Sequence, residues 1–141
     1  MDEIDARIAS LDLTLFEHVV SQSTENDKRS LLALQSAVRG WHSSYSYLEI
    51  GSYLGGSLQP HVLDPRCGKI ISIDPRPYAK AVRDQRGHDQ LYIDNSAEGM
   101  LKLLAIIPGA DLKKITTFEK DASALDINAV GTQPDYCFDG I

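Results

Sequence analysis

Short strand-like segments alternate with helical segments over the last hundred residues, and this alternation limits the chain to few folds. Apolar and β-branched runs bounded by turn-forming residues predict four strands, at residues 45–50, 69–74, 114–119 and 135–139. Helical spacing of apolar residues predicts the helices between them, at about 58–64, 78–85, 96–107 and 125–130. Strand–helix–strand repeats of this length favour parallel strands with right-handed crossovers, so we expect an α/β fold on a parallel sheet.

The residues before the first strand have a different pattern, which predicts two amphipathic helices. Apolar side chains at mixed spacing of three and four predict the first helix within residues 11–20. The capping sequence Thr24-x-x-Asp27 predicts the start of the second helix, and Gly40 stands where a C′ glycine would end it. Trp41 is expected to pack where these helices meet the rest of the chain.

Length and charge place the chain among single folded domains with an acidic surface. Its 141 residues comprise an N-terminal helical extension, 1–41, and a main domain, 42–141. The formal net charge of −6 argues against nucleic-acid binding, which depends on Lys and Arg at phosphates. No run reaches the about 18 apolar residues of a membrane span. The two cysteines are far apart in sequence, which fits a reducing compartment, so we expect a cytoplasmic protein. From the charge and the short apolar runs we expect no nucleic-acid partner and no membrane partner.

Each predicted strand is followed by a glycine-rich turn or a carboxylate. The first strand leads into the turn Gly51–Ser57, and the second ends at Asp74. Asp121 follows the third strand, and Asp139 ends the fourth. Parallel sheets bind ligands beyond the carboxyl ends of their strands, so these four positions predict a ligand site.

The glycine turn excludes two common nucleotide motifs. The span from Gly51 to Gly56 matches a phosphate-binding P-loop, but Ser57 stands where that motif needs lysine. Tyr53 stands where the dinucleotide fingerprint needs its middle glycine. Gly51, Gly55 and Gly56 would let the backbone approach a ligand closely, and the next helix would offer its N–H groups. A tight turn without a ligand is the alternative.

Single acidic residues near the turn have both a binding and a structural interpretation. Asp74 is placed to accept hydrogen bonds from ribose hydroxyls, or to cap a helix. Asp121 could accept from an adenine amine while the Ala122 N–H donates to a ring nitrogen, or it could cap a helix. Glu49, inside a buried strand, needs a partner among loop N–H groups or a ligand ammonium. The histidines and cysteines show no metal-site spacing.

The segment Y-L-E-I-G-S-Y-L-G-G-S, residues 47–57, resembles motif I of the class I S-adenosylmethionine-dependent methyltransferases, in its small-molecule O-methyltransferase form. Residues 71–74 resemble the acidic second-strand motif of that family, and residues 118–122 its third-strand motif. Residues 134–140 resemble its fourth-strand motif. The four motifs stand in the family's order and span about residues 45–140.

The resemblance implies S-adenosylmethionine as cofactor, O-methylation of a small-molecule substrate and a Rossmann-like sheet of strand order 3-2-1-4. It implies that the cofactor is held by Glu49, Gly51, Ser52, Tyr53, Gly55, Ser57, Asp74, Asp121, Ala122 and Asp139. Glu49 and the turn would hold the methionine portion, Asp74 the ribose, and Asp121 with Ala122 the adenine. Asp139 would be the catalytic residue beside the sulfonium and the acceptor. In relatives a carboxylate there helps bind a divalent cation, or a nearby His is the base; both remain open.

The family's domain has seven strands, whereas this sequence predicts four. The resemblance therefore implies the cofactor-binding half of a larger domain, or a half that another chain completes. The last strand would lie at an exposed edge, so this edge or the N-terminal helices could join copies into a homo-oligomer. Two alternatives stay open: a non-catalytic Rossmann-like fragment that associates through that edge, and a nicotinamide-dependent oxidoreductase, which would share the glycine turn and Asp74.

Overall fold

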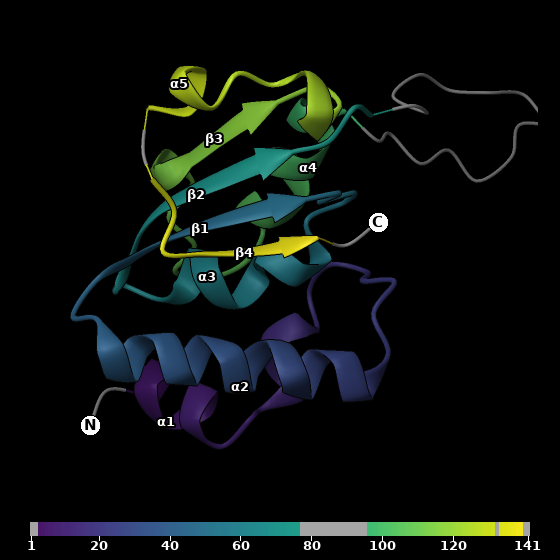
Figure 1. The fold of residues 1–141 in the computed structure, drawn as a ribbon. Helices are drawn as coiled ribbons and strands as arrows, with labels where there is room; N and C mark the ends of the chain where they lie inside the picture. The colour runs from purple at the N-terminus through teal and green to yellow at the C-terminus, as the bar shows by residue number, and fades with distance from the viewer. Residues whose placement is uncertain (1–2, 77–95, 132, 140–141) are drawn as a thin grey trace, which may run out of the picture.

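A computed structural model of the chain describes residues 3–76, 96–131 and 133–139. Its centre is a four-stranded parallel sheet in the order β3-β2-β1-β4 (Figure 1). The strands are β1 (Tyr45–Ile50), β2 (Cys67–Ile73), β3 (Ile115–Phe118) and β4 (Tyr136–Asp139). The structure thus confirms the predicted α/β class and the order 3-2-1-4 of a Rossmann-like half-sheet.

The central strands are buried, whereas the two outer strands of the described sheet are partly exposed. Most residues of β1 and β2 are buried, including Tyr47 and Leu48 of β1 and Ile70 and Ile71 of β2. Along β4 the half-buried Tyr136 and Phe138 alternate with the exposed Cys137 and Asp139. Because β1 pairs with both β2 and β4, its carboxyl end lies between theirs, and Ile50 is opposite both Ile73 and Asp139.

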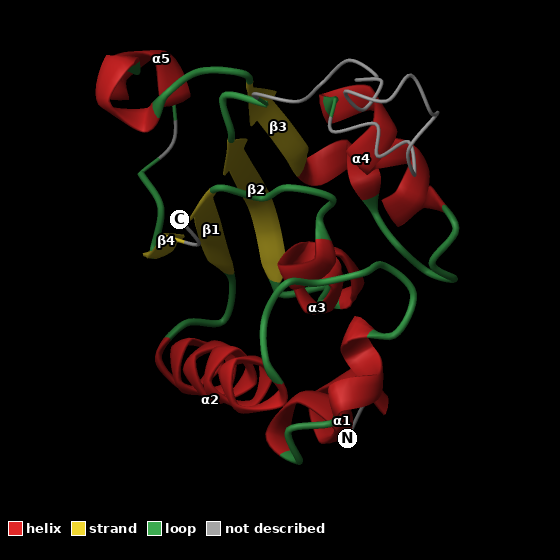
Figure 2. Cartoon of the chain, turned by 90° about the vertical axis from the view of Figure 1, so that its right-hand side faces the viewer, coloured by secondary structure: helices red, strands yellow, loops and turns green. Residues whose placement is uncertain are grey.

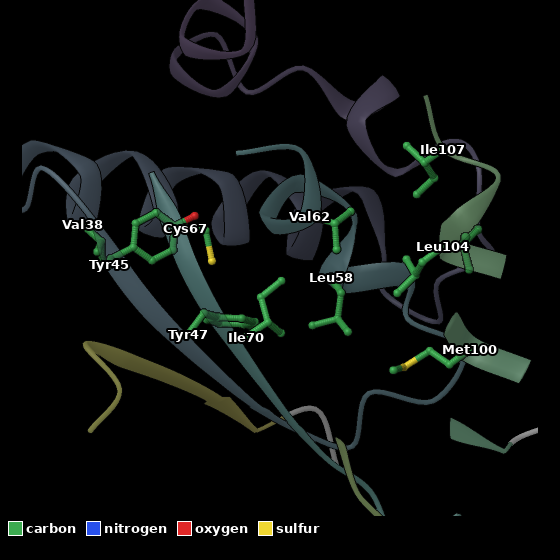
Figure 3. Packing of buried hydrophobic residues seen from close by; sticks show 11 residues of the cluster. Val38, Tyr45, Tyr47, Leu58, Val62, Cys67, Ile70, Met100, Leu104 and Ile107 are labelled. Atoms are coloured by element: carbon green, nitrogen blue, oxygen red, sulfur yellow. The ribbon is translucent and has the colours of Figure 1, made fainter. Parts of the chain in front are cut away.

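Helices cover both faces of this sheet (Figure 2). On one face α3 (Gln59–Leu63) and α4 (Ala97–Ala105) enclose the main core, with residues such as Leu58, Ile70 and Leu104 in contact (Figure 3). On the other face α5 (Ile127–Val130) contributes Val130 to a smaller cluster with Leu48, Ile71 and Ile73. Short 3-10 turns are η2 (Gly56–Leu58), η3 (Leu112–Lys114) and η4 (Ala122–Ala124).

Most predicted elements occur within a few residues of their expected bounds. The strand predicted at 69–74 begins at Cys67 and ends at Ile73, and the helix predicted at 125–130 begins at Ile127. The predicted helix at 78–85 lies outside the described residues. Within the described residues, no helix has the length and apolar character needed to cross a membrane.

The prediction of a helix within residues 11–20 is wrong. The helix is α1 (Glu3–Ala9), and the later stretch contains only the single turn η1 (Leu13–Phe16). Leu11 has a positive φ of 57°, which interrupts the helix, and the Asp12 carboxylate caps the following turn. Three of the apolar side chains that suggest a helical stripe are nevertheless buried, namely Leu15, Phe16 and Val19, whereas Val20 is exposed.

The second N-terminal helix, α2 (Glu25–Trp41), begins as predicted but ends later. Thr24 and Asp27 form the expected capping box. Gly40 is not a C′ glycine, because it lies inside the helix and its φ is not positive. The expectation that Trp41 packs against the main domain is also wrong, since its side chain is 77% exposed while Val38 faces the core.

A buried carboxylate joins α2 to the sheet. Asp64, at the end of α3, is fully buried and accepts hydrogen bonds from Gln35 of α2 (3.1 Å) and Tyr45 of β1 (3.0 Å). Arg39 of α2 forms an ion pair with it at 2.9 Å. A buried charge is tolerated only when it is paired and hydrogen-bonded, so Asp64 fixes where α2 lies against the sheet.

We predict that Asp64→Asn lowers the free energy of unfolding by about 2 kcal/mol, because it removes one of the two carboxylates that pair with the buried Arg39 guanidinium, the other being Asp5. Urea denaturation followed by circular dichroism measures the change. The matched control is Glu98→Gln, which removes an exposed carboxylate paired with Lys102 on α4 and should cost less than about 0.5 kcal/mol. Equal effects of the two substitutions would contradict the role of Asp64.

Candidate functional site

A cavity of about 330 Å³ lies where the carboxyl ends of β1 and β4 face the N-terminal segment. One wall comes from the glycine turn and the end of β4, namely Gly51, Ser52, Tyr53, Gly56, Ser57, Phe138 and Asp139. The other wall comes from the segment before α2 and from α2 itself, namely Val20, Ser21, Gln22, Ser23, Asp27, Ser30, Leu31 and Leu34. The volume is within the range of small-molecule sites.

Half of the residues assigned from the sequence meet at this cavity. Gly51, Ser52, Tyr53, Ser57 and Asp139 line it directly. The remaining five assigned residues are absent from the described lining: Glu49, Gly55, Asp74, Asp121 and Ala122. The N-terminal wall was not predicted, because its residues carry no motif and reach the site only through tertiary packing.

The turn after β1 has a strained backbone that is held at both ends. Gly51 and Gly55 have positive φ of 81° and 88°, and Tyr53 has a φ of 51°, which is unusual for a residue with a side chain. The Gly51 N–H donates to the carbonyl of Ile73 at 2.7 Å. The Tyr53 N–H donates to the Asp74 carboxylate at 2.8 Å. The strand ends therefore hold the turn in one conformation beside the cavity.

The two later glycines of the turn allow close packing against the protein itself. A Cβ on Gly55 would lie 2.9 Å from the Met100 side chain of α4. A Cβ on Gly56 would lie 2.6 Å from the backbone of Ser21. The sequence predicts that Gly55 and Gly56 let the backbone approach a ligand closely. At these two positions the backbone instead approaches α4 and the N-terminal segment.

Gln59 fastens the N-terminal segment to the turn. Its side chain is fully buried, and its Oε1 accepts the N–H groups of His18 and Val19, both at 3.0 Å. Its Nε2 donates to the carbonyls of Phe16 (2.9 Å), Val19 (2.8 Å) and Gly56 (2.8 Å). One amide thus satisfies backbone groups from both walls, and sequence reasoning missed it because a lone Gln on a helix resembles a surface residue.

Glu49 lies next to the cavity, behind Ser57, and is fully buried. Its Oε1 accepts hydrogen bonds from Ser57 (2.5 Å) and Tyr47 (3.1 Å). Its Oε2 has no hydrogen-bond partner within the described residues. Burial raises the pKa of Glu49 to about 7, and the hydroxyl groups of Ser57, Ser52 and Tyr47 only partly oppose this. The carboxyl group is therefore ready to receive either a proton or a cation.

Asp74 and Arg76 follow β2 and contact the turn at Tyr53. Asp74 is buried and also accepts the Arg76 N–H at 2.8 Å, so both its oxygens contact backbone groups. The buried Arg76 guanidinium donates to the Tyr53 carbonyl and contacts the Met100 sulfur at 3.1 Å. Burial lowers the pKa of Arg76, and the nearby Asp74 opposes this. These contacts connect the turn to the end of β2 and to Met100 of α4.

Asp121 caps the short turn η4, as its structural interpretation anticipated. It is exposed and accepts the N–H of Ser123 at 2.9 Å and its hydroxyl at 2.8 Å. The backbone hydrogen bond from Ser123 lowers the pKa of Asp121. Ala122 packs at the margin of the cluster around Ile71. Neither contact tests whether Asp121 and Ala122 bind an adenine, so adenine binding by these residues stays a prediction.

Among the described residues, no group of three or more His, Cys, Asp or Glu side chains is arranged to hold a metal ion. Comparison of the chain with protein-family models, with curated proteins and with solved structures finds no match.

We predict that Gly56→Ala separates the two walls, because the added Cβ has no room against Ser21. Unfolding should become easier by about 1–3 kcal/mol, and the amides of His18 and Val19 should exchange faster with deuterium. Gly68→Ala is the control, since the nearest atom outside its chain neighbours, the Tyr45 carbonyl oxygen, is 4.0 Å from the new Cβ. Unchanged exchange at both amides in the Gly56 variant would contradict the coupling.

Glu49 should also make stability depend on pH. Its pKa is near 7 when folded, against an ordinary value of 4.5, so the unfolded chain loses this proton first as pH rises. The contribution of Glu49 to the free energy of unfolding is thus greatest below about pH 4.5 and is lost by about pH 7, on the order of 1–3 kcal/mol. Glu49→Gln removes this loss, so its stability relative to wild type should rise across that range. A difference that stays constant with pH would refute the assignment, and Glu98→Gln is the control.

Proposed function

We propose that this chain binds S-adenosylmethionine at the carboxyl ends of β1 and β4 and acts in O-methylation of a small molecule. The observation that carries the proposal is the buried Glu49 carboxyl group, with one oxygen unpartnered within the described residues, directly behind a cavity formed by the glycine turn. A cofactor with an ammonium group supplies the cation that such a carboxylate needs.

The residues around the cavity suit the methionine portion of this cofactor. Glu49 would ionise and face the ammonium, while Ser57 keeps its hydrogen bond to the same carboxylate. Gly51 and Ser52 line the cavity with little side-chain bulk beside the strained turn, so a ligand can lie against the backbone. When bound, the cofactor supplies an electrophilic methyl group on its sulfonium.

Asp139 is the residue proposed to orient the acceptor and to accept its proton. It ends β4, lines the cavity and lies opposite Ile50 in the sheet register, next to the start of the glycine turn. A carboxylate there can orient an acceptor hydroxyl toward the methyl group and accept its proton as the oxygen attacks. Asp74 is proposed to hold the ribose, and Asp121 with Ala122 the adenine. A divalent cation beside Asp139 remains compatible with the proposal.

The edge strand supports a second candidate function, association between chains. β4 forms one outer strand of the described sheet and exposes Cys137 and Asp139. An open edge is a template for pairing with another strand, so a homo-oligomer through β4 is the alternative to a purely catalytic role. The nicotinamide-dependent alternative is less well supported, because Tyr53 occupies the place of the middle glycine. Two free cysteines support the proposed cytoplasmic location.

The proposal predicts that binding of S-adenosylhomocysteine releases a proton from Glu49. At pH 7 the carboxyl group is about half protonated, and the ligand ammonium should ionise it, releasing roughly half a proton per site. Calorimetric titrations in two buffers of different ionisation enthalpy measure this number. Release should vanish near pH 8.5 and in Glu49→Gln, whose affinity should fall about tenfold or more.

Glu98→Gln, on the exposed face of α4, is the matched control and should behave as wild type. Failure to detect binding at millimolar ligand would contradict the proposed function. Binding with no proton release at pH 7 would instead contradict the place given to Glu49.

A further inference from the structure

We propose that the acceptor lies against the N-terminal wall of the cavity and is a hydroxyl compound that also carries an ammonium group, with Asp27 as the residue that selects this charge. The inference rests on the proposed function and adds to it the class of substrate.

Every charged side chain in the described lining is acidic. Asp27 of α2 lies on one wall and Asp139 of β4 on the other, and the described lining contains no Lys, Arg or His. A third carboxyl group, Glu49, is buried behind Ser57 with one oxygen unpartnered within the described residues. A cationic molecule entering between these walls is attracted, whereas an anionic one is repelled.

The basic residues beside Asp27 are engaged away from the cavity. The Lys28 ammonium lies over the Phe16 ring, 5.8 Å from its centroid. Arg29 pairs with Glu25 at 3.5 Å, one turn back along α2. These two cations therefore do not take the place of a ligand cation at the cavity.

The position of Asp27 is fixed by the start of its helix. Its Oδ2 accepts the Thr24 N–H at 3.1 Å, and its own N–H donates to the Thr24 hydroxyl at 3.1 Å. The segment just before it is held by Gln59 and packs on Gly56. Asp27 is thus a pre-positioned charge, which costs little further ordering when a ligand binds.

The rest of this wall suits a small amphipathic molecule. Ser30 and Gln22 offer hydrogen bonds, while Leu31 and Leu34 offer apolar surface. An acceptor with a compact apolar body, a hydroxyl group toward Asp139 and an ammonium group toward Asp27 would satisfy both walls together.

Three catechols that differ only in side-chain charge test this inference: dopamine, 4-ethylcatechol and 3,4-dihydroxyphenylacetate. Calorimetry gives the Kd of each for the full chain saturated with S-adenosylhomocysteine, at pH 7 and low ionic strength. We expect the cation to bind about tenfold more tightly than the anion, with the neutral compound between them, and added salt to reduce the difference.

Asp27→Asn should lower the cation-to-anion ratio of affinities by about 3- to 5-fold. Asparagine can still accept the Thr24 N–H, so the helix start is retained. The matched control, Glu25→Gln, removes an acid from the same helical turn that is not among the cavity residues, and should leave the ratio unchanged.

Four outcomes would overturn the inference: equal affinities of the three compounds, preference for the anion, equal effects of the two substitutions, or binding of none of them to a protein that does bind S-adenosylhomocysteine. Absence of S-adenosylhomocysteine binding would be a different failure, that of the proposed function itself.

Discussion

The hydrogen bonds of the Gln59 amide are the constraint on which the candidate site depends. This buried side chain holds backbone groups of Phe16 and Val19 on one side and of Gly56 on the other. Without them these buried groups would lack partners, which is costly in a protein interior. The segment before α2 is consequently a fixed wall of the cavity, and the glycine turn and the N-terminal helices form one structural unit.

A second consequence concerns the balance of charge at the carboxyl ends of the strands. Glu49 is buried beside the cavity with an elevated pKa, while Asp27 and Asp139 line it. Burying a carboxylate without a cation is unfavourable, so this end of the sheet is more stable when a positive group arrives. The buried Glu49 carboxyl group thus favours the proposed cofactor, whereas the exposed carboxylates Asp27 and Asp139 favour the proposed acceptor through their charge.

Local sequence signals predicted the sheet well and the N-terminal region only in part. The strand Tyr45–Ile50 and the capping box at Thr24 depend on neighbouring residues, so pattern alone located them. The helix predicted within residues 11–20 is wrong because the turn at Leu13–Phe16 also places apolar residues at helix-like spacing. The wall that completes the cavity rests on Gln59, whose partners are some forty residues away in sequence, and no local pattern records such contacts.

The most direct test of the account maps S-adenosylhomocysteine onto the chain by amide NMR. Titration should shift the resonances of Gly51, Ser52 and Gly56 most strongly, together with those of residues 21–23 across the cavity. The account is contradicted if these resonances do not move. It is equally contradicted if the shifts are confined to the separate groove beside α1, lined by residues such as Arg7 and Pro108.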